Sequence, residues 1–287
     1  MIRLACERPA DSQVPLARWS SSELAAELVT RGICEQISGV TVWRWLSEDA
    51  IKPWQHRSWI FPRDPEFTAK AGRILDLYGG RWEGELLHPG DYVVCCDEKP
   101  SIQARARKHQ TLPAKRAVNR GQRVEHEYER RGALCYLAAW DARRAKIFDW
   151  CAPKDGIEPF DALVDQFMSQ HPYRNAQRVF LVIDNGSAHR GKRSIDRLTG
   201  AWPNLIPVHT PVHASWLNQG EIYFSVVQRK VLTPNDFADL DTLEAQLLTF
   251  GRRYEQIAEP FQWKFTRADL NKLLAKTDTH QTTSLAA

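Results

Sequence analysis

The sequence has no long hydrophobic run and no regular cysteine pattern. A membrane-spanning helix needs roughly 18 consecutive apolar residues, and no apolar run in this chain of 287 residues approaches that length. No membrane partner is therefore expected. The first residues lack the apolar core of a signal peptide. Six cysteines show no disulfide-framework spacing, and adjacent Cys95 and Cys96 would be buried thiols on opposite faces of a strand. These absences exclude membrane spans and a disulfide-stapled secreted domain, and they favour a reducing cytoplasm.

The sequence also has little net charge, +4, which permits nucleic-acid binding without requiring it. That charge is unevenly distributed. The segment from Lys99 to Arg131 carries ten Lys or Arg against three Glu, whereas residues 1–62 carry seven basic and seven acidic residues. We therefore expect phosphate contacts in the segment that follows residue 97. The alternative for this basic run is a solvated, mobile loop.

The first 62 residues predict short helices only. Ser20 and Glu23 form a capping-box pattern that opens the first helix, and further helices are expected at residues 33–37 and 40–47. In the third helix, the spacing places Val42, Trp45 and Leu46 inward and Thr41, Trp43 and Arg44 outward. This pattern is compatible with a helix-turn-helix that enters a major groove, and also with an ordinary small helical bundle.

Residues 63–90 predict a connector, and from residue 91 the chain alternates strands and helices. Strands are expected at 91–97, 123–130, 133–141, 146–150, 178–184 and 205–208, and helices at 158–169, 192–199 and 217–231. The second and third strands would form a hairpin about Arg131 and Gly132. This order predicts a mixed α/β sheet with crossing helices over residues 91–250. Residues 251–287 would form a helical C-terminal extension, with a disordered tail from Thr277 onward.

Three carboxylates are distinguished by their context. Asp97 ends the apolar run at 92–96, Asp184 ends the run at 179–183, and Glu221 stands at the entry to the last predicted helix. An aspartate that follows a buried strand lies at the rim of a sheet, where ligands collect, although taken alone it is more often a turn residue. Clustered carboxylates repel each other unless a cation neutralises them, and Mg²⁺ prefers oxygen ligands. Two ions about 4 Å apart would stabilise the attacking and leaving oxygens of a phosphoryl displacement.

The residues around these carboxylates narrow the interpretation. The three segments are Cys-Asp-Glu-Lys-Pro-Ser-Ile-Gln (96–103), Ile-Asp-Asn-Gly-Ser-Ala-His-Arg (183–190) and His-Thr-Pro-Val-His-Ala-Ser-Trp-Leu-Asn-Gln-Gly-Glu-Ile-Tyr-Phe (209–224). Together they resemble the DDE transposases of the mariner-like superfamily, and more closely the bacterial insertion-sequence branch called the IS-six-thirty family. The resemblance extends from about Arg18 to Phe265. The 37 positions from Asp184 to Glu221 are close to the usual gap of that family.

The resemblance implies a ribonuclease H-like catalytic domain preceded by a helix-turn-helix DNA-binding region. It implies that Asp97, Asp184 and Glu221 are the catalytic triad and hold two Mg²⁺ or Mn²⁺ ions. The implied activity is cleavage at transposon ends and strand transfer into target DNA at TA. The implied partner is double-stranded DNA, both terminal inverted repeats and target, bound by a homodimer in the bacterial cytoplasm or at the nucleoid. The family has more N-terminal helical sequence than this chain, so one DNA-reading module is expected to be missing.

Further residues are expected around the triad and on the DNA. Asn185 and His189 flank the second aspartate of the site. Either His189 lies near the scissile phosphate or a metal-bound water, or the two are a helix-capping Asn and a surface His. Trp216 would wall the site, and Asn218 would cap the helix of Glu221. The expected DNA-binding residues are Thr41, Arg44, Lys99, Arg105, Arg107 and Lys108.

Two functions stay open at this point. One is an active transposase, and the other is a truncated or domesticated transposase that occupies transposon ends as a repressor without catalysis. The presence of all three carboxylates favours the first, and the shortened N-terminus favours the second. A plain ribonuclease H is a weaker third option, because it would not need the helical N-terminal region.

Overall fold

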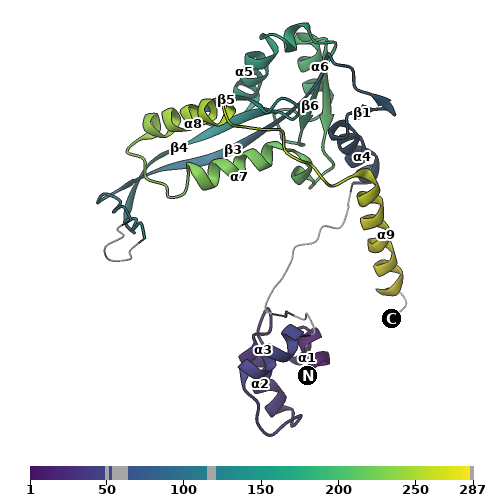
Figure 1. Cartoon of the computed structure of the whole chain (residues 1–287), viewed down its shortest axis with the longest axis vertical. Coiled ribbons are helices and arrows are strands. Elements are labelled where there is room, and N and C mark those ends of the chain that lie inside the picture. The colour runs from purple at the N-terminus through teal and green to yellow at the C-terminus, as the bar shows by residue number, and fades with distance from the viewer. Residues whose placement is uncertain (49–51, 54–63, 115–120, 285–287) are drawn as a thin grey trace. The chain divides into compact units, whose positions relative to one another are not determined.

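The chain forms two compact units, Met1–Ile60 and Phe61–Ala287, in a computed structural model of the protein (Figure 1). The structure describes residues 1–48, 52–53, 64–114 and 121–284. The predicted boundary at residue 62 lies outside these residues, as do Lys115, Arg116 and Arg120 of the basic run. Within the described ranges, no helix combines the length and the hydropathy needed to cross a bilayer.

The N-terminal unit is a small helical bundle. Its elements are α1 (Ile2–Cys6), the 3-10 turn η1 (Pro9–Ser12), α2 (Ser21–Thr30) and α3 (Gly39–Glu48). The predicted capping box is present, because the Ser20 hydroxyl accepts the Glu23 N–H at 3.2 Å and the Glu23 carboxylate accepts the Ser20 N–H at 2.8 Å. The core of this unit includes Trp19, Leu24, Leu28, Val42 and Leu46.

Two expectations for this unit are wrong. Residues 33–37 form no helix, because Gly32 takes a positive φ of 66° at the end of α2 and too few residues remain before Ser38 begins the next helix. Trp45 does not face inward and is 42% exposed. A short helix that packs on one neighbour buries only a narrow stripe, here Val42 and Leu46, and Trp45 lies on its flank.

The second unit is built on a five-stranded mixed sheet in the order β5-β4-β3-β6-β7 (Figure 1). The strands are β3 (Asp91–Arg107), β4 (Tyr128–Asp141), β5 (Lys146–Ala152), β6 (Arg178–Ile183) and β7 (Leu205–His209). The pairs β3–β4 and β4–β5 are antiparallel, and β3, β6 and β7 are parallel. The predicted mixed α/β class is therefore confirmed.

Helices cover both faces of this sheet. One face packs against α4 (Phe67–Tyr78), α7 (Gly220–Lys230), α8 (Leu240–Glu255) and the start of α9 (Arg267–Ser284), and the other against α5 (Ile157–Met168) and α6 (Lys192–Ala201). Successive residues of β3 alternate between these two cores, Val93 and Cys95 in the first and Val94 and Cys96 in the second. The small remaining elements are β1 (Arg81–Trp82), β2 (Glu85–Leu86), η3 (Tyr173–Asn175) and η4 (Ser215–Leu217).

β3 and β4 are longer than predicted and pair with each other, so the predicted hairpin about Arg131 and Gly132 is wrong. β4 continues through both residues, because they form a bulge opposite β3 in which Gly132 takes a φ of 102°. β3 continues through Pro100, because its pairing with β4 is interrupted between Lys99 and Ile102. The missing N–H of proline therefore removes no ladder hydrogen bond there.

The C-terminal helix α9 extends to Ser284, over most of the segment that was expected to be a disordered tail. Its start is capped: the Asp269 carboxylate accepts the Thr266 N–H at 3.0 Å, and the Thr266 hydroxyl accepts the Asp269 N–H at 3.2 Å. Neither glycine nor proline follows in the sequence up to residue 284, so no residue interrupts the helix.

Candidate active site

The register of β3 against β6 brings Asp97 level with Asp184. In this parallel pair Asp91 lies opposite Arg178 and Cys95 opposite Val182, a constant offset of 87 positions. Continued for two residues beyond the last pair, Cys95 with Val182, the same offset aligns Asp97 with Asp184, one residue beyond the end of β6. Neighbouring strands are about 4.8 Å apart, so the two aspartates emerge side by side at the carboxyl end of the parallel pair.

The start of α7 brings Glu221 to the same edge. Asn218 is fully buried just before this helix, donates its side-chain NH₂ to the Cys96 carbonyl at 2.7 Å and accepts the Gly220 N–H at 3.0 Å. Gly220 then allows a close approach to β3, since a Cβ built there would lie 3.1 Å from the Asp97 Cβ. Glu221 follows directly in the chain and is exposed.

The charges of this cluster act on one another. Burial raises the pKa of Asp97 to about 8, and the negative charges of Glu221, Glu98 and Asp184 contribute to that rise. One hydrogen bond, from the Glu98 N–H at 2.9 Å, opposes it. Asp97 therefore lacks a compensating positive charge among the described residues, which is the environment that a bound cation would relieve.

Asp184 is held in place by His189. The His189 Nε2 lies 2.6 Å from Asp184 Oδ1, and the Gly186 N–H donates to the same oxygen at 2.7 Å. This hydrogen bond with His189 lowers the pKa of Asp184. His189 itself is only 1% exposed and packs on Phe160 of α5, with ring centroids 4.6 Å apart. The surface-histidine alternative is therefore wrong.

The donor chemistry of the cluster fits a hard divalent cation, because the three side chains offer only carboxylate oxygens. Both side-chain hydrogen bonds of Asp184 go to Oδ1, and its Oδ2 has no hydrogen-bond partner among the described residues. In the described part of the chain, no group of three or more His, Cys, Asp or Glu side chains is already arranged to hold a metal ion.

The other residues predicted near the site have structural partners. Asn185 donates to the Thr210 carbonyl at 2.7 Å, and so links the ends of β6 and β7 instead of capping a helix. Trp216 lies in η4, is 37% exposed and meets Phe265 edge-on with ring centroids 5.8 Å apart. Asn218 accepts the Gly220 N–H at the start of α7, although the residue at the N-cap position is Gln219.

The predicted DNA-binding residues lie in three places. Thr41 and Arg44 are on α3 of the N-terminal unit, where Arg44 is exposed. Lys99 and Arg105 line a cavity between β3 and the end of α7. Arg107 and Lys108 stand at the far end of β3, where the chain leaves the sheet.

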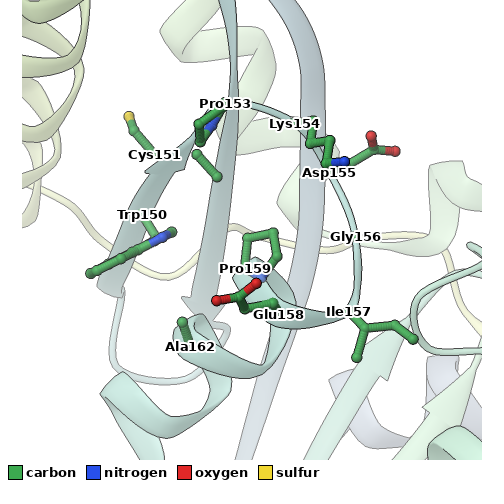
Figure 2. Close-up of a pocket in the computed structure, with 11 residues that line it drawn as sticks. Trp150, Cys151, Pro153, Lys154, Asp155, Gly156, Ile157, Glu158, Pro159 and Ala162 are labelled. Carbon is green, nitrogen blue, oxygen red and sulfur yellow. The ribbon is translucent and has the colours of Figure 1, made fainter.

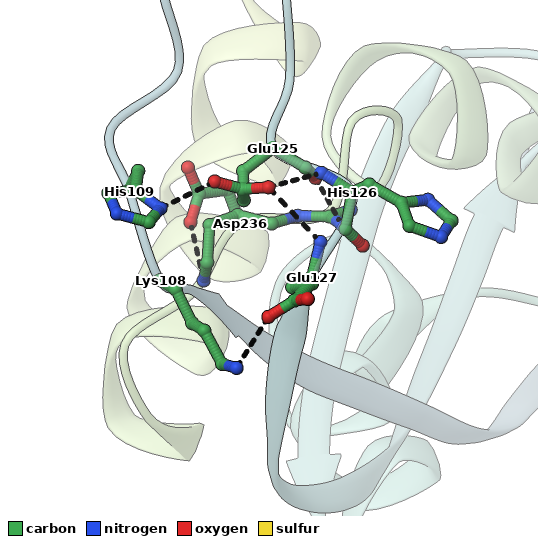
Figure 3. Close-up of polar contacts among 7 residues, drawn as sticks. Lys108, His109, Glu125, His126, Glu127 and Asp236 are labelled. Carbon is green, nitrogen blue, oxygen red and sulfur yellow. Dashed lines mark hydrogen bonds and ion pairs between the residues drawn. The ribbon is translucent and has the colours of Figure 1, made fainter.

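The two residues at the end of β3 are engaged with neighbouring segments. The Arg107 guanidinium donates to the carbonyls of Asn235 at 3.0 Å and Glu125 at 2.8 Å. Lys108 forms an ion pair with Glu127, and in the same group His109 contacts Glu125 (Figure 3). These contacts hold the two chain segments beyond β3 and β4 together.

Sequence reasoning missed three residues that shape the site. Gly220 was visible next to Glu221, but its closeness to Asp97 depends on the packing of α7. Glu98 follows Asp97 on the opposite face of β3, where burial raises its pKa and the charge of Asp184 adds to that rise. Tyr78 donates its hydroxyl to the Leu217 carbonyl at 2.7 Å, from 139 positions away, and no local pattern predicts such a contact.

Comparison with known proteins defines the class of this fold and site. The family described as DDE superfamily endonuclease matches residues 92–244, more than half of the chain and the whole segment that carries the three carboxylates. The chain belongs to this family of endonucleases, and is thus an enzyme that acts on polynucleotide backbones. No curated protein matches its sequence.

Solved transposase structures are similar to this chain at low sequence identity. A structure of the Mos1 mariner paired end complex with Mn is 13% identical, with a TM-score of 0.52 over 85% of this chain and 69% of that chain. A Mos1 paired end complex with Mg is 16% identical, with a TM-score of 0.49 over 83% and 73%. The first match confirms the predicted ribonuclease H-like arrangement of the mixed sheet and its flanking helices.

Proposed function

We propose that the chain is the transposase of a bacterial insertion sequence of the IS-six-thirty branch. It cuts DNA at the terminal inverted repeats and joins the freed end to target DNA at TA. The proposal is supported by the close approach of the start of α7 to Asp97, and by the charges of Glu221 and Asp184 acting on Asp97, in a chain of the DDE endonuclease family. Those three carboxylates are the catalytic residues of this proposal.

Each residue of the site has a physical task. Asp97, Asp184 and Glu221 would hold two Mg²⁺ or Mn²⁺ ions, which supply charge neutralisation and activation of water when bound. His189 fixes the orientation of Asp184, so that its Oδ2 is presented to a ligand. Asn218 connects the strand of Asp97 to the helix of Glu221 and sets the distance between them. The Mos1 structures were obtained with Mn and with Mg, which supports the choice of cation.

The DNA partners follow from the same proposal. The helices of the N-terminal unit would read the terminal repeat through Thr41 and Arg44 on α3, and the basic segment after Asp97 would contact phosphates. The Mos1 structures are paired end complexes, which supports a homodimer on DNA as the working form. We place the protein in the bacterial cytoplasm, at the nucleoid when it is bound.

Replacing Asp184 by asparagine tests the proposal. The variant loses one carboxylate ligand and little volume, so cleavage of a duplex carrying the repeats that flank the gene should fall by at least about 10³-fold while binding stays within about twofold. Asp196→Asn makes the same chemical change on an exposed position of α6 and should cleave like wild type. Cleavage should require Mg²⁺ or Mn²⁺, and Ca²⁺ should support binding only. Cleavage that survives in Asp184→Asn or in excess EDTA would contradict the assignment, and specific binding without any cleavage would leave the repressor alternative.

A further inference from the structure

A cavity of about 310 Å³ opens beside the proposed active site, between the bulged part of β3 and the end of α7. None of its nine lining residues is acidic, and two, Lys99 and Arg105, are basic. Its other polar lining comes from Ser101, Gln103, Gln228 and Asn235. One water occupies about 30 Å³ of liquid, so the cavity has room for an anionic group and several waters.

Two further cavities among the described residues of this unit differ from it in charge or in place. A larger one, of about 500 Å³, lies between the end of β5 and the start of α5 (Figure 2), and Asp155 and Glu158 outnumber Lys154 in its wall. A third contains Arg143 and Arg144 but lies at the first residues of β3, the end of the strand opposite to the catalytic edge. The cavity beside α7 alone among these three combines a positive lining with closeness to the carboxylates.

Its two basic side chains are not neutralised by an acidic neighbour among the described residues, and Arg105 is held in place by an aromatic ring. Neither Lys99 nor Arg105 forms an ion pair with any described residue. The guanidinium of Arg105 lies over the ring of Tyr128, 4.8 Å from its centroid, while its Nε is buried without a hydrogen-bond partner. Burying such a donor without a partner is unfavourable, so a ligand that offers a hydrogen-bond acceptor to Nε would be stabilised there.

The backbone of Arg105 is fixed as well. Its N–H donates to the Asn235 side chain at 3.1 Å, and Asn235 in turn donates to the Gln103 carbonyl at 2.7 Å. The loop after α7 is therefore attached to β3 along one wall of the cavity. On the other side, Ser101 takes a positive φ of 57° where the pairing of β3 with β4 is interrupted. Bulges of this kind redirect side chains next to active sites.

One exposed face of α7 runs from Glu221 to the cavity. On α7, Glu221, Ser225 and Gln228 are exposed and share one face, at spacings of four and three residues. Gln228 lines the cavity and lies about 10 Å along the helix axis from Glu221, at 1.5 Å per residue. A DNA strand advances about 3.4 Å per nucleotide along its axis, so this distance corresponds to about three nucleotides.

We propose that this cavity binds one backbone phosphate of the DNA strand that is cut, about three nucleotides from the scissile phosphate, between Lys99 and Arg105. The inference rests on the proposed function in that it takes DNA as the substrate. It separates the predicted contact residues into two pairs. Lys99 and Arg105 share a single phosphate. Arg107 instead donates to backbone carbonyls, and Lys108 forms an ion pair with Glu127.

The first measurement is the salt dependence of binding to a random-sequence duplex, with the full-length protein in EDTA so that no cleavage occurs. Each phosphate contact contributes about 0.9 to the slope of log affinity against log salt. Because both side chains serve one phosphate, the double variant Lys99→Gln/Arg105→Ala should flatten the slope by about 0.9. The control Arg174→Ala removes an exposed charge at the opposite end of β6 and should leave the slope unchanged.

The second measurement locates the phosphate. Single neutral methylphosphonate linkages are placed one at a time along the cleaved strand of the gene's terminal repeat. Wild type should lose about tenfold in affinity at one position on one side of the cleavage site, and the double variant should show no loss there. All other positions should respond alike in both proteins. Thermal unfolding of each variant confirms that it is folded, and Lys99→Gln alone replaces the double variant if Arg105→Ala does not fold.

The outcomes are distinct from those of the cleavage test. An unchanged slope in the double variant would overturn the phosphate site, and so would a flattening near 1.8, which means two separate phosphates. A flattening that Arg174→Ala reproduces would overturn it too, because the effect would then be one of net charge. If the slope and the methylphosphonate position behave as expected while no divalent cation supports cleavage, the phosphate site stands and the proposed function fails.

Discussion

Replacing Gly220 by alanine tests whether the start of α7 sets the position of Glu221. The added Cβ would lie 3.1 Å from the Asp97 Cβ and 3.2 Å from Asn218 Oδ1, whereas ordinary contacts begin at 3.4 Å. The first turn of α7 must therefore move away from β3 by about 0.3 Å. A misplacement of about 1 Å costs about 10²-fold in rate, so this shift should slow DNA cleavage roughly fourfold.

Stability should respond differently from activity in this variant. Alanine is about 1 kcal/mol better than glycine within a helix, and this gain offsets the strain of the close contact. We expect the free energy of unfolding to change by less than about 1 kcal/mol. The assay is single-turnover cleavage of a terminal-repeat duplex with Mn²⁺, together with denaturant unfolding.

A matched glycine provides the control. Gly200 lies in α6, and a Cβ there would meet nothing within 4 Å. Gly200→Ala should stabilise the protein by up to about 1 kcal/mol and leave cleavage unchanged. Wild-type cleavage by Gly220→Ala would refute the reasoning, because the close approach of α7 to Asp97 would then have no part in placing Glu221.

Two further predictions concern stability against pH and DNA recognition. Burial raises the pKa of Asp149 to about 6, while the Tyr136 hydroxyl donates to its carboxylate at 2.9 Å. The folded protein thus keeps the Asp149 proton up to about pH 6, whereas the unfolded chain releases it near pH 4. Protonated Asp149 therefore stabilises the fold fully below about pH 4. This stabilisation, up to about 3 kcal/mol, is lost as the pH rises past 6. The difference in unfolding free energy between Asp149→Asn and wild type is measured at about pH 4 and at about pH 7.5. Between these two pH values it should change in favour of the variant by up to that amount. A difference that does not depend on pH would contradict the raised pKa of Asp149. Arg44→Ala should weaken binding to terminal-repeat DNA by about tenfold in a gel-shift assay, since Arg44 is exposed on α3, and equal binding would reject the helix-turn-helix interpretation.

The class of the fold was predictable, because it depends on local patterns. The apolar run before Asp184 predicts the end of β6, and the apolar spacing after Glu221 predicts a helix. The strand end predicted at Asp97 is wrong, because β3 continues to Arg107. The register was not predictable. It is the offset between β3 and β6 that brings the two aspartates level, and no residue in either strand encodes its partner.

The extent of β3 and β4 was mispredicted for a specific physical reason. Pro100 and the pair Arg131 and Gly132 are ordinary signals for the end of a strand or for a turn. In the folded chain both fall at bulges, where the ladder is interrupted and such residues remove no hydrogen bond. The cavity that Lys99 and Arg105 line lies along the first of these bulges. The sequence did not predict this cavity, because Pro100 led to a predicted strand that ended before Lys99 and Arg105.

The link made by Asn218, from the carbonyl of Cys96 to the start of α7, has a consequence for synthesis of the protein in the cell. Its two partners are separated by more than a hundred residues, so a ribosome that adds about 5–20 residues per second exposes Cys96 many seconds before Asn218. For most of that interval the growing chain contains Asp97 alone, then Asp184 as well, but it has neither Glu221 nor the Asn218 amide that fixes the start of α7. Under the proposed function, a chain that stalls or is cleaved before α7 would lack Glu221, and unfinished copies would not cut DNA near the gene.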